Sequence, residues 1–537
     1  MTDSLEITGR AASPGLAAGP IFRLDQIDPL AATQPDQPTD PGREGTLLAQ
    51  AVEAATSGLT DLMDRVDEES AAIVEFQIAM LEDDSLAEPA IDAIAGGATA
   101  VEAWSQALDA QIADYRSSDD DYFQARSADL ADLKDRVLRH LSGERAAQIP
   151  PGSIVVGSDI TPTRFLETDW TQGGGLALLA GSAASHVAML ARSRGVPMAV
   201  GLGDAALDGH GEAILDGGRG SLILSPDQVQ SQDFAERRVD LARQQERDAS
   251  FLGKPATTAD GTAAKVMINV ADLSDLDAVD APTCDGIGLM RSEFLFYGEG
   301  GLPDEETQYQ AYKRLLRWAA DRPVIVRTLD AGGDKPIPGL TPEGDKNPFL
   351  GVRGVRLSLA RPDIFTVQLR ALARAAEHGQ LKIMLPMVTV AEELDQAAQL
   401  LDQAIEALKA EGIPCARPPL GIMVEVPAVA LEPDLLSRAD FFSIGSNDLT
   451  QYVMAGARDN PDVSGLLDAG HAAVTGLIDR VALAGNRLGI EVSLCGDMAG
   501  DPAHTETLLK AGIRTYSVAP PLLGRVKATI ADIDLSG

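Results

Sequence analysis

The chain has 537 residues, of which 45% are hydrophobic, and its formal net charge at neutral pH is −37. A chain of this length exceeds what one hydrophobic core organises, so several domains are expected. The charge excludes nucleic acid and anionic membranes as general partners, because both would repel most of the surface.

The sequence also argues against secretion and membrane insertion. The N-terminal segment lacks a basic region followed by an apolar run, and no apolar stretch reaches membrane-spanning length. Cys284, Cys415 and Cys495 are far apart and have no metal-ligand spacing, which argues against a disulfide framework or a zinc site. We therefore expect a cytoplasmic protein.

The first half of the chain is predicted to be an α/β domain with a helical insertion. Leu48, Val52, Ala55, Leu59, Leu62 and Val66 recur at steps of four and three, which is typical of a helix. From Ile149 onwards, short β-type runs alternate with Gly and Pro turns. We assign residues 1–32 and 146–228 to the α/β domain, 33–145 to the α-helical insertion and 229–252 to a linker helix.

Residues 253–537 alternate strand-like runs with helical segments. The strand-like runs start at KVMINV and end at EVSLC. Repeated β-α units over such a length predict a parallel (β/α)₈ barrel of the TIM type, with an active site at the carboxyl ends of its strands.

Polar residues end or follow several of these predicted strands. Arginine's planar fork suits phosphate and carboxylate alike, and converging cations would repel one another without an anion between them. Two of the acids offer oxygen ligands for Mg²⁺. Together these arginines, lysine and acids predict a site for a phosphorylated carboxylic acid that is bound through a metal. The alternative is that they form ion pairs with a purely structural role. The residues are Arg291, Arg327, Lys335, Arg353, Asn447 and Arg458, with Glu425 and Asp448 as the metal ligands.

Cys495 ends the last of these strand-like runs, EVSLC. A thiol there is suited to protonating a carbanion-like enolate, since its pKa lies nearer neutrality than that of most donors. The alternative is a small buried hydrophobe. Cys284 and Cys415 are interpreted as structural.

His186 is one of six histidines and follows a good N-cap residue, Ser185. A helix is predicted from His186 to Arg194, with Gly195 ending it. A helix N-terminus disfavours a cationic imidazole and favours an anion. A neutral ring there can act as a nucleophile and then carry a phosphoryl group, although a lone histidine can also be structural.

The stretch GSAASHVAMLARSRGVPMAVG resembles the phosphohistidine signature of enzyme I of the phosphoenolpyruvate (PEP):sugar phosphotransferase system. In the same order, GIGLMRSEFLF, IVRTLDAGGDK, NPFLGVRGVR, IMVEVPA, FFSIGSNDLTQY and CGDMAG resemble the signatures of that family's PEP-binding barrel. PEP synthase and pyruvate phosphate dikinase share these motifs but need a large ATP-grasp domain, which we expect this chain to lack. We also expect neither a sensory domain nor a fused carrier domain.

This resemblance implies a PEP-protein phosphotransferase with a swivelling phosphohistidine domain. PEP would bind in the barrel with Mg²⁺ on Glu425 and Asp448, His186 would take its phosphoryl group, and Cys495 would protonate the enolpyruvate. The phosphocarrier protein HPr would then receive the group, docking on the helical insertion near the acidic residues 82–84. Arg291, Arg327, Lys335, Arg353, Asn447 and Arg458 would hold the phosphate and carboxylate, and the barrel would form a homodimer.

The chain departs from the family pattern at two positions beside the histidine. Ser182 replaces a glycine and Ala184 replaces a threonine whose hydroxyl would contact the histidine or its phosphate. These changes leave a non-catalytic sensor of PEP or pyruvate as an alternative. A free-standing small-molecule phosphotransferase is a third possibility.

Overall fold

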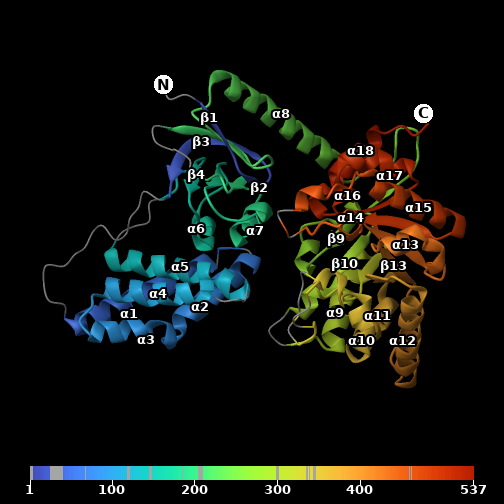
Figure 1. Ribbon diagram of the computed structural model, residues 1–537, viewed down its shortest axis with the longest axis horizontal. Coiled ribbons are helices and arrows are strands. Elements are labelled where there is room, and N and C mark those ends of the chain that lie inside the picture. The colour runs from blue at the N-terminus through green and yellow to red at the C-terminus, as the bar shows by residue number, and fades with distance from the viewer. Residues whose placement is uncertain are drawn as a thin grey trace. The chain divides into compact units, whose positions relative to one another are not determined.

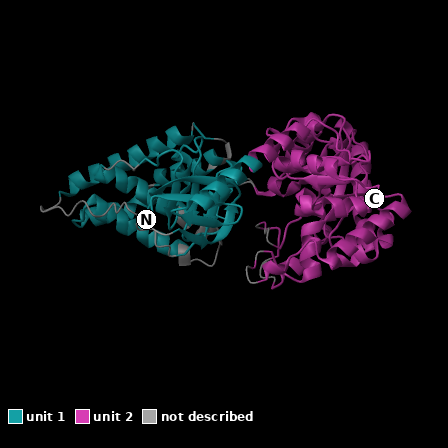
Figure 2. Ribbon diagram, turned by 90° about the horizontal axis from the view of Figure 1, so that it is seen from above, with its two compact units in different colours: residues 1–240 teal, residues 241–537 magenta. Residues whose placement is uncertain are grey.

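The computed structural model describes residues 4–24, 40–63, 65–66, 68–117, 121–143, 148–183, 185–203, 210–297, 301–333, 337, 339–342, 346–458, 460 and 463–536. The chain divides into two compact units, residues 1–240 and 241–537, shown in different colours in Figure 2. Among the described helices, none is long and apolar enough to cross a membrane.

The described part of the first unit contains an eight-stranded sheet in the order β1-β8-β7-β3-β4-β5-β6-β2. Its centre, β3 to β6, is parallel, whereas the pairs β1–β8, β8–β7, β7–β3 and β6–β2 are antiparallel. The strands are β1 (Leu5–Thr8), β2 (Arg10–Ser13), β3 (Leu16–Arg23), β4 (Ile154–Gly157), β5 (Gly175–Leu178), β6 (Met198–Val200), β7 (Glu212–Asp216) and β8 (Ser221–Leu224).

Five helices of the described chain lie between β3 and β4 in the sequence and stack together (Figure 1). In the first of them, Leu48, Ala55, Leu59 and Leu62 are buried, as their spacing predicts, while Val66 lies beyond the helix end. The helices are α1 (Pro41–Met63), α2 (Glu68–Glu82), α3 (Asp84–Ala95), α4 (Ala100–Ser117) and α5 (Asp121–Ser142).

The helical insertion packs on the sheet domain through a common hydrophobic core. At their junction, Asp132 of α5 accepts hydrogen bonds from the backbone N–H and the hydroxyl of Thr163, in α6 (Pro162–Glu167), at 3.2 and 2.6 Å. Arg136 pairs with Glu167 at 2.5 Å. The insertion is therefore fixed to the sheet domain by both apolar and ionic contacts.

A long charged helix, α8 (Gln228–Phe251), crosses the boundary between the two units. In the second unit, Arg247 near its end bonds both carboxylate oxygens of Asp532 at 2.5 and 2.6 Å. The buried ammonium of Lys527 donates to the carbonyls of Leu252, Lys254 and Thr283 at 2.6 to 2.9 Å. These contacts anchor the end of α8 to the barrel.

The described part of the second unit forms a closed barrel of eight parallel strands. Alternate residues face its interior, so Leu289, Ile325, Met384, Met423, Phe441 and Cys495 form a separate inner cluster. The strands are β9 (Lys265–Val270), β10 (Ile287–Arg291), β11 (Val324–Arg327), β12 (Leu381–Leu385), β13 (Leu420–Val424), β14 (Phe441–Gly445), β15 (Glu491–Cys495) and β16 (Thr515–Val518).

Helices surround this barrel (Figure 1) and bury their apolar faces against the strands in one large core. They are α9 (Glu305–Ala319), α10 (Val355–Ala360), α11 (Pro362–Ala375), α12 (Ala391–Ala410), α13 (Pro427–Leu431), α14 (Ser446–Met454), α15 (Ala472–Leu488), α16 (Asp497–Gly500), α17 (Pro502–Lys510) and α18 (Leu523–Asp532).

The predicted fold class, an α/β domain with a helical insertion, a linker helix and a (β/α)₈ barrel, is confirmed. The sequence analysis named no run for β1, β7 or β16, which the structure adds to the sheet and the barrel. The residue limits given for the four parts stay a prediction.

Candidate active site

The carboxyl ends of the barrel strands bring most of the described candidate residues to one mouth. Arg291 and Arg327 end β10 and β11 and are paired in register. Glu425 directly follows β13, Asp448 lies in the first turn of α14 after β14, and Cys495 ends β15. Parallel strands in a closed barrel share one direction, so these residues converge although up to 204 positions separate them in the sequence.

Two of the candidate arginines are buried in ion pairs with acids of the chain itself. Arg327 contacts Glu293 Oε2 and Asp330 Oδ2, both at 3.0 Å. Arg353 contacts Asp330 Oδ2 at 2.9 Å and Asp448 Oδ1 at 3.2 Å. The arginines therefore converge without an external anion, which corrects the argument that their mutual repulsion requires one.

Glu293 and Asp330 are functional-site residues that the sequence analysis missed. Both are buried, at 4% and 1% exposure. A signal was present, because Glu293 lies two residues after Arg291 and Asp330 three residues after Arg327. Spacing alone did not indicate that Asp330 also reaches Arg353, which is 23 residues away.

Donor groups remain available beside these ion pairs. The Nε atoms of Arg291 and Arg327 are buried and have no hydrogen-bond partner within the part of the chain that the structure describes. The positive charges of both arginines act to lower the pKa of Cys495, against the larger effect of burial. The mouth can therefore bind an anion through buried guanidinium N–H groups.

Glu425 is a buried acid of this mouth with a raised pKa. Burial and the negative charges of Asp448 and Asp330 raise its pKa to about 8, against the opposing effect of Arg327 and Arg353. Its Oε1 accepts the backbone N–H of Met387 at 2.7 Å, while its buried Oε2 has no hydrogen-bond partner among the described residues. A buried carboxylate oxygen without a hydrogen-bond partner is suited to coordinate a cation.

The described residues contain no ready-made group of three or more His, Cys, Asp or Glu side chains that could hold a metal. Glu425 and Asp448 supply only two carboxylates. Two are enough for Mg²⁺, because this ion usually keeps several water ligands and is also coordinated by oxygen atoms of the bound substrate. Asp448 Oδ1 is meanwhile contacted by Arg353 at 3.2 Å and by Arg458 at 3.8 Å.

Asn447 and Arg458 lie near Asp448 but point to different neighbours. Asn447 Oδ1 accepts the backbone N–H of Asp497 at 2.9 Å, which orients the amide toward the loop after β15. The guanidinium carbon of Arg458 lies 5.9 Å from the centre of the Phe349 ring, and that of Arg353 lies 6.0 Å from it. Phe349 therefore forms an aromatic edge to the mouth, a feature that the sequence analysis did not include.

Cys495 is 1% exposed and lies inside the barrel. Its Sγ accepts a hydrogen bond from Ser443 Oγ and donates one to the carbonyl of Ile444, both at 3.5 Å. Burial raises the pKa of this thiol to about 11. The thiol is thus held in its protonated form, farther from neutrality than the sequence analysis assumed but still able to donate a proton.

His186 is the first residue of helix α7 (His186–Ser193), and Ser185 caps that helix by accepting the backbone N–H of Ala188 at 3.2 Å. Arg192 donates to the carbonyls of Ala12 and Ala183 at 2.6 and 2.9 Å, which ties the preceding loop to β2. The imidazole of His186 and all of Lys335 and Ala184 lie outside the described residues.

Three family models match consecutive parts of this chain. The PEP-binding domain of PEP-utilising enzymes matches residues 245–535, their mobile domain matches residues 149–220, and their N-terminal domain matches residues 8–126. The first of these alone covers the whole barrel described above.

Curated relatives match over nearly the full chain. A phosphoenolpyruvate-protein phosphotransferase of Geobacillus stearothermophilus is 35% identical over 96% of this chain and 90% of its own length. One of Haloferax volcanii is 37% identical over 88% of this chain and 83% of its own. A multiphosphoryl transfer protein of Xanthomonas campestris pv. campestris is 37% identical over 99% of this chain, which spans only 64% of that longer relative.

These matches confirm the family and the class of enzyme that the motifs predicted. The chain belongs to the PEP-utilising enzymes, in the group of the phosphoenolpyruvate-protein phosphotransferases.

Proposed function

We propose that this chain transfers the phosphoryl group of PEP to its own His186 and then to a histidine phosphocarrier protein of the HPr type, releasing pyruvate. The observation that carries this proposal is the barrel mouth, where buried arginines, two candidate metal ligands and a protonated thiol meet. Phosphoryl transfer needs chiefly positioning and charge neutralisation, which such a set of groups supplies.

His186 has the second role in this proposal, as the group that accepts the phosphoryl. Its place at the first position of a capped helix gives an attached phosphate the helix N–H groups and dipole as partners. The direct test is to incubate the chain with labelled PEP and Mg²⁺ and then to add HPr-type carriers from the same cell. Binding of PEP without release of pyruvate would indicate the sensor instead.

Mg²⁺ is the cofactor that fits this site. Glu425 and Asp448 would hold it, because Glu425 has an unbonded buried oxygen and burial and the charge of Asp448 raise its pKa. When bound, the ion would neutralise charge that develops on the phosphoryl and enolate oxygens. The arginines of the chain would orient the substrate anion beside it.

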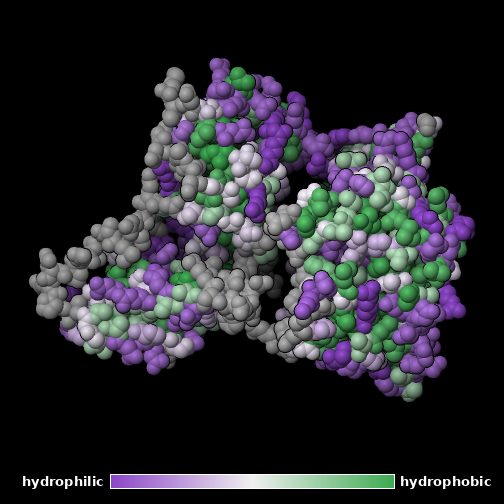
Figure 3. Space-filling view, in the orientation of Figure 1, coloured by the Kyte–Doolittle hydropathy of each residue, from purple (hydrophilic) through white to green (hydrophobic). Residues whose placement is uncertain are grey.

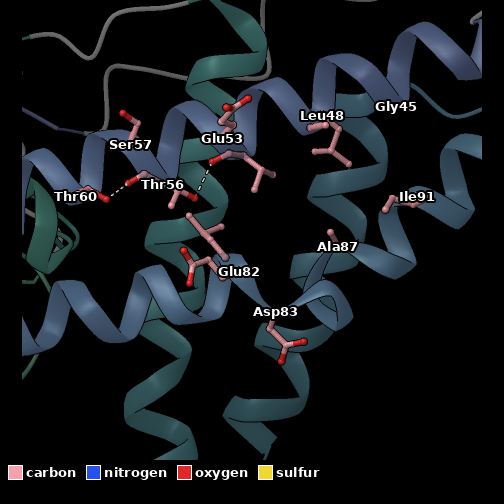
Figure 4. A pocket seen from close by; sticks show the side chains of 13 residues that line it. Gly45, Leu48, Glu53, Thr56, Ser57, Thr60, Glu82, Asp83, Ala87 and Ile91 are labelled. Carbon is pink, nitrogen blue, oxygen red and sulfur yellow. Dashed lines mark hydrogen bonds between the residues drawn. The ribbon is translucent and has the colours of Figure 1, made fainter.

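The helical insertion offers a site for the acceptor protein. A groove of about 570 Å³ lies between α1 and the α2–α3 junction, and Leu48 and Ile91 line it (Figure 4). Glu53, Glu82 and Asp83 add negative charge at its edge. An apolar floor with an acidic rim suits a carrier protein that presents a basic surface around its own histidine.

Charge reversal in this groove is expected to weaken carrier binding. Glu53→Lys and Glu82→Lys should each raise the Kd for the carrier about 3- to 10-fold, mainly through slower association. Calorimetry or surface plasmon resonance at two salt concentrations measures this change. Asp83 is avoided because its carboxylate caps α3 through the N–H of Ser85 at 2.9 Å.

The matched control for the groove is Glu236→Lys. This residue is exposed on α8 in the same unit and changes the net charge equally. If Glu236→Lys weakened carrier binding as much as the groove variants, overall charge would explain the effect and the groove would not be the docking site.

Replacement of Cys495 by alanine is expected to slow pyruvate formation about 100-fold or more. The parent thiol is protonated at neutral pH, because burial raises its pKa to about 11, and alanine cannot supply that proton. A coupled pyruvate assay with excess carrier gives the rate. Cys415→Ala, at a half-buried cysteine outside the mouth, is the control; equal rates for the two variants would contradict the role of Cys495.

A homodimer formed through the barrel and a location in the cytoplasm complete the proposal. Exposed leucines from α13, the 3₁₀ turn Pro433–Leu436 and α15 offer an apolar surface: Leu431, Leu435 and Leu483 are 48, 64 and 67% exposed. Figure 3 shows hydrophobic residues on the visible face of this unit. Burial of such side chains favours association of two copies.

A further inference from the structure

Asp330 lies at the centre of the buried ion pairs. One of its oxygens, Oδ2, contacts Arg327 Nη1 at 3.0 Å and Arg353 Nη2 at 2.9 Å. Its other oxygen, Oδ1, accepts a further hydrogen bond from Arg353 Nε at 3.3 Å. The same carboxylate therefore joins the guanidinium group at the end of β11 to one in the segment before α10.

Asp330 is itself held in place by buried polar groups. Its backbone N–H donates to Glu293 Oε1 at 2.8 Å, and Glu293 Oε2 pairs with Arg327 Nη2 at 3.0 Å. The N–H of the preceding residue, Leu329, donates to Gln368 Oε1 at 3.0 Å. Gln368 Nε2 donates in turn to the hydroxyls of Ser292 and Tyr312, both at 3.1 Å.

The backbone of Gly354 lies close to the same carboxylate. Gly354 has a φ of +58°, and a Cβ there would lie 2.9 Å from Met387 and 3.3 Å from Asp330 Oδ1. Glycine accepts both the backbone conformation and the close approach. A glycine next to Arg353 therefore leaves room for the contact between Arg353 and Asp330.

An arginine side chain has many rotamers, and a binding site loses affinity when such a side chain must be ordered by its ligand. A fixed carboxylate that bonds two arginines orders both in advance. We propose that Asp330 is a positioning residue, which sets the spacing of the Arg327 and Arg353 guanidinium groups so that both engage one substrate anion. This inference rests on the proposed binding of PEP at the barrel mouth.

Positioning and charge make opposite predictions for one substitution. Asp330→Asn removes a negative charge next to the arginines, so a purely electrostatic role predicts tighter binding of an anion. A positioning role predicts weaker binding, because an amide offers one acceptor oxygen where the carboxylate offers two. Asp330→Glu keeps the charge but moves the carboxylate oxygens. A positioning role again predicts weaker binding of the anion, whereas a purely electrostatic role predicts no change in affinity.

The test measures PEP binding by calorimetry with Mg²⁺ present, in full-length chains that carry His186→Ala to prevent turnover. We expect Asp330→Asn and Asp330→Glu each to raise the Kd for PEP about 10-fold. The control is Asp363→Asn, which breaks an exposed pair with Arg361 of 2.9 Å. Unchanged or tighter binding in Asp330→Asn overturns the inference.

A second measurement determines the positions of the Arg327 and Arg353 guanidinium groups and does not depend on PEP binding. Crystal structures of the parent and of Asp330→Asn should differ in the separation of the two guanidinium groups, and unmoved arginines overturn the inference. If the parent chain binds no PEP, the proposed function fails, while this comparison still decides the role of Asp330. Should Asp330→Asn not fold, Glu293→Gln removes part of the same support and should raise the Kd about 3-fold.

Discussion

A His186→Ala chain is expected to take up no label from PEP above background, whereas the parent chain becomes labelled. The phosphate of the parent should be acid-labile and base-stable, as a phosphoramidate bond to a ring nitrogen is. The physical reason is that His186 begins a capped helix, so its ring can hold the transferred group at a helix N-terminus. Filter binding and autoradiography after acid and base treatment measure the label.

The control for this variant is His210→Ala. His210 belongs to the same unit, and its Nδ1 lies 2.9 Å from Ser225 Oγ. We expect normal labelling of the His210 variant. Equal labelling of His186→Ala would overturn the proposed function, because another residue would then accept the phosphoryl group.

Arg327→Lys is expected to lower kcat/KM for PEP about 100- to 1,000-fold. Lysine keeps the positive charge but loses the planar fork, which here contacts Glu293 and Asp330 at once. The lower kcat/KM would therefore result from lost geometry and hydrogen bonding and not from a change in charge. Steady-state release of pyruvate with saturating carrier protein gives kcat and KM separately.

Arg361→Lys is the matched control for this substitution, because Arg361 forms an exposed pair with Asp363 in the same unit. Exposed ion pairs contribute little to stability, so this variant should behave as the parent. Thermal unfolding of both variants separates folding from binding. A fully folded Arg327→Lys chain with parental kcat/KM would remove Arg327 from the active site.

The periodicity of the sequence was sufficient to predict the main architecture. Helix α1 buries one face because apolar residues recur at helical spacing, and the charged helix α8 follows the sheet domain. The four-residue strand β16 was missed, although TYSV alternates polar and apolar residues, because so short a run is a weak signal by itself. It is identified as a strand only by its pairing with β9 and β15 in the closed barrel.

The candidate site was predicted as a group of residues but not as a network of contacts. Chain order showed that Arg327 and Glu425 follow strands, and barrel topology then required that they converge. No local pattern could show that Asp330 bridges Arg327 and Arg353, since that contact depends on how the segment between β11 and α10 folds back on itself. The raised pKa of Cys495 could not be predicted from the local sequence either, because it results from burial of the thiol inside the barrel.

The place where the helical insertion enters the sheet limits how the protein can be shortened. Strands β3 and β4, which precede and follow the insertion, are parallel neighbours with Ile21 paired to Ile154. Parallel neighbours cannot be joined by a tight hairpin turn, because the chain must travel back along the strand before re-entering the sheet. A minimal version without α1–α5 therefore needs a replacement crossover of about a dozen residues or more, and a direct splice of residue 23 to residue 154 would unravel the sheet's centre.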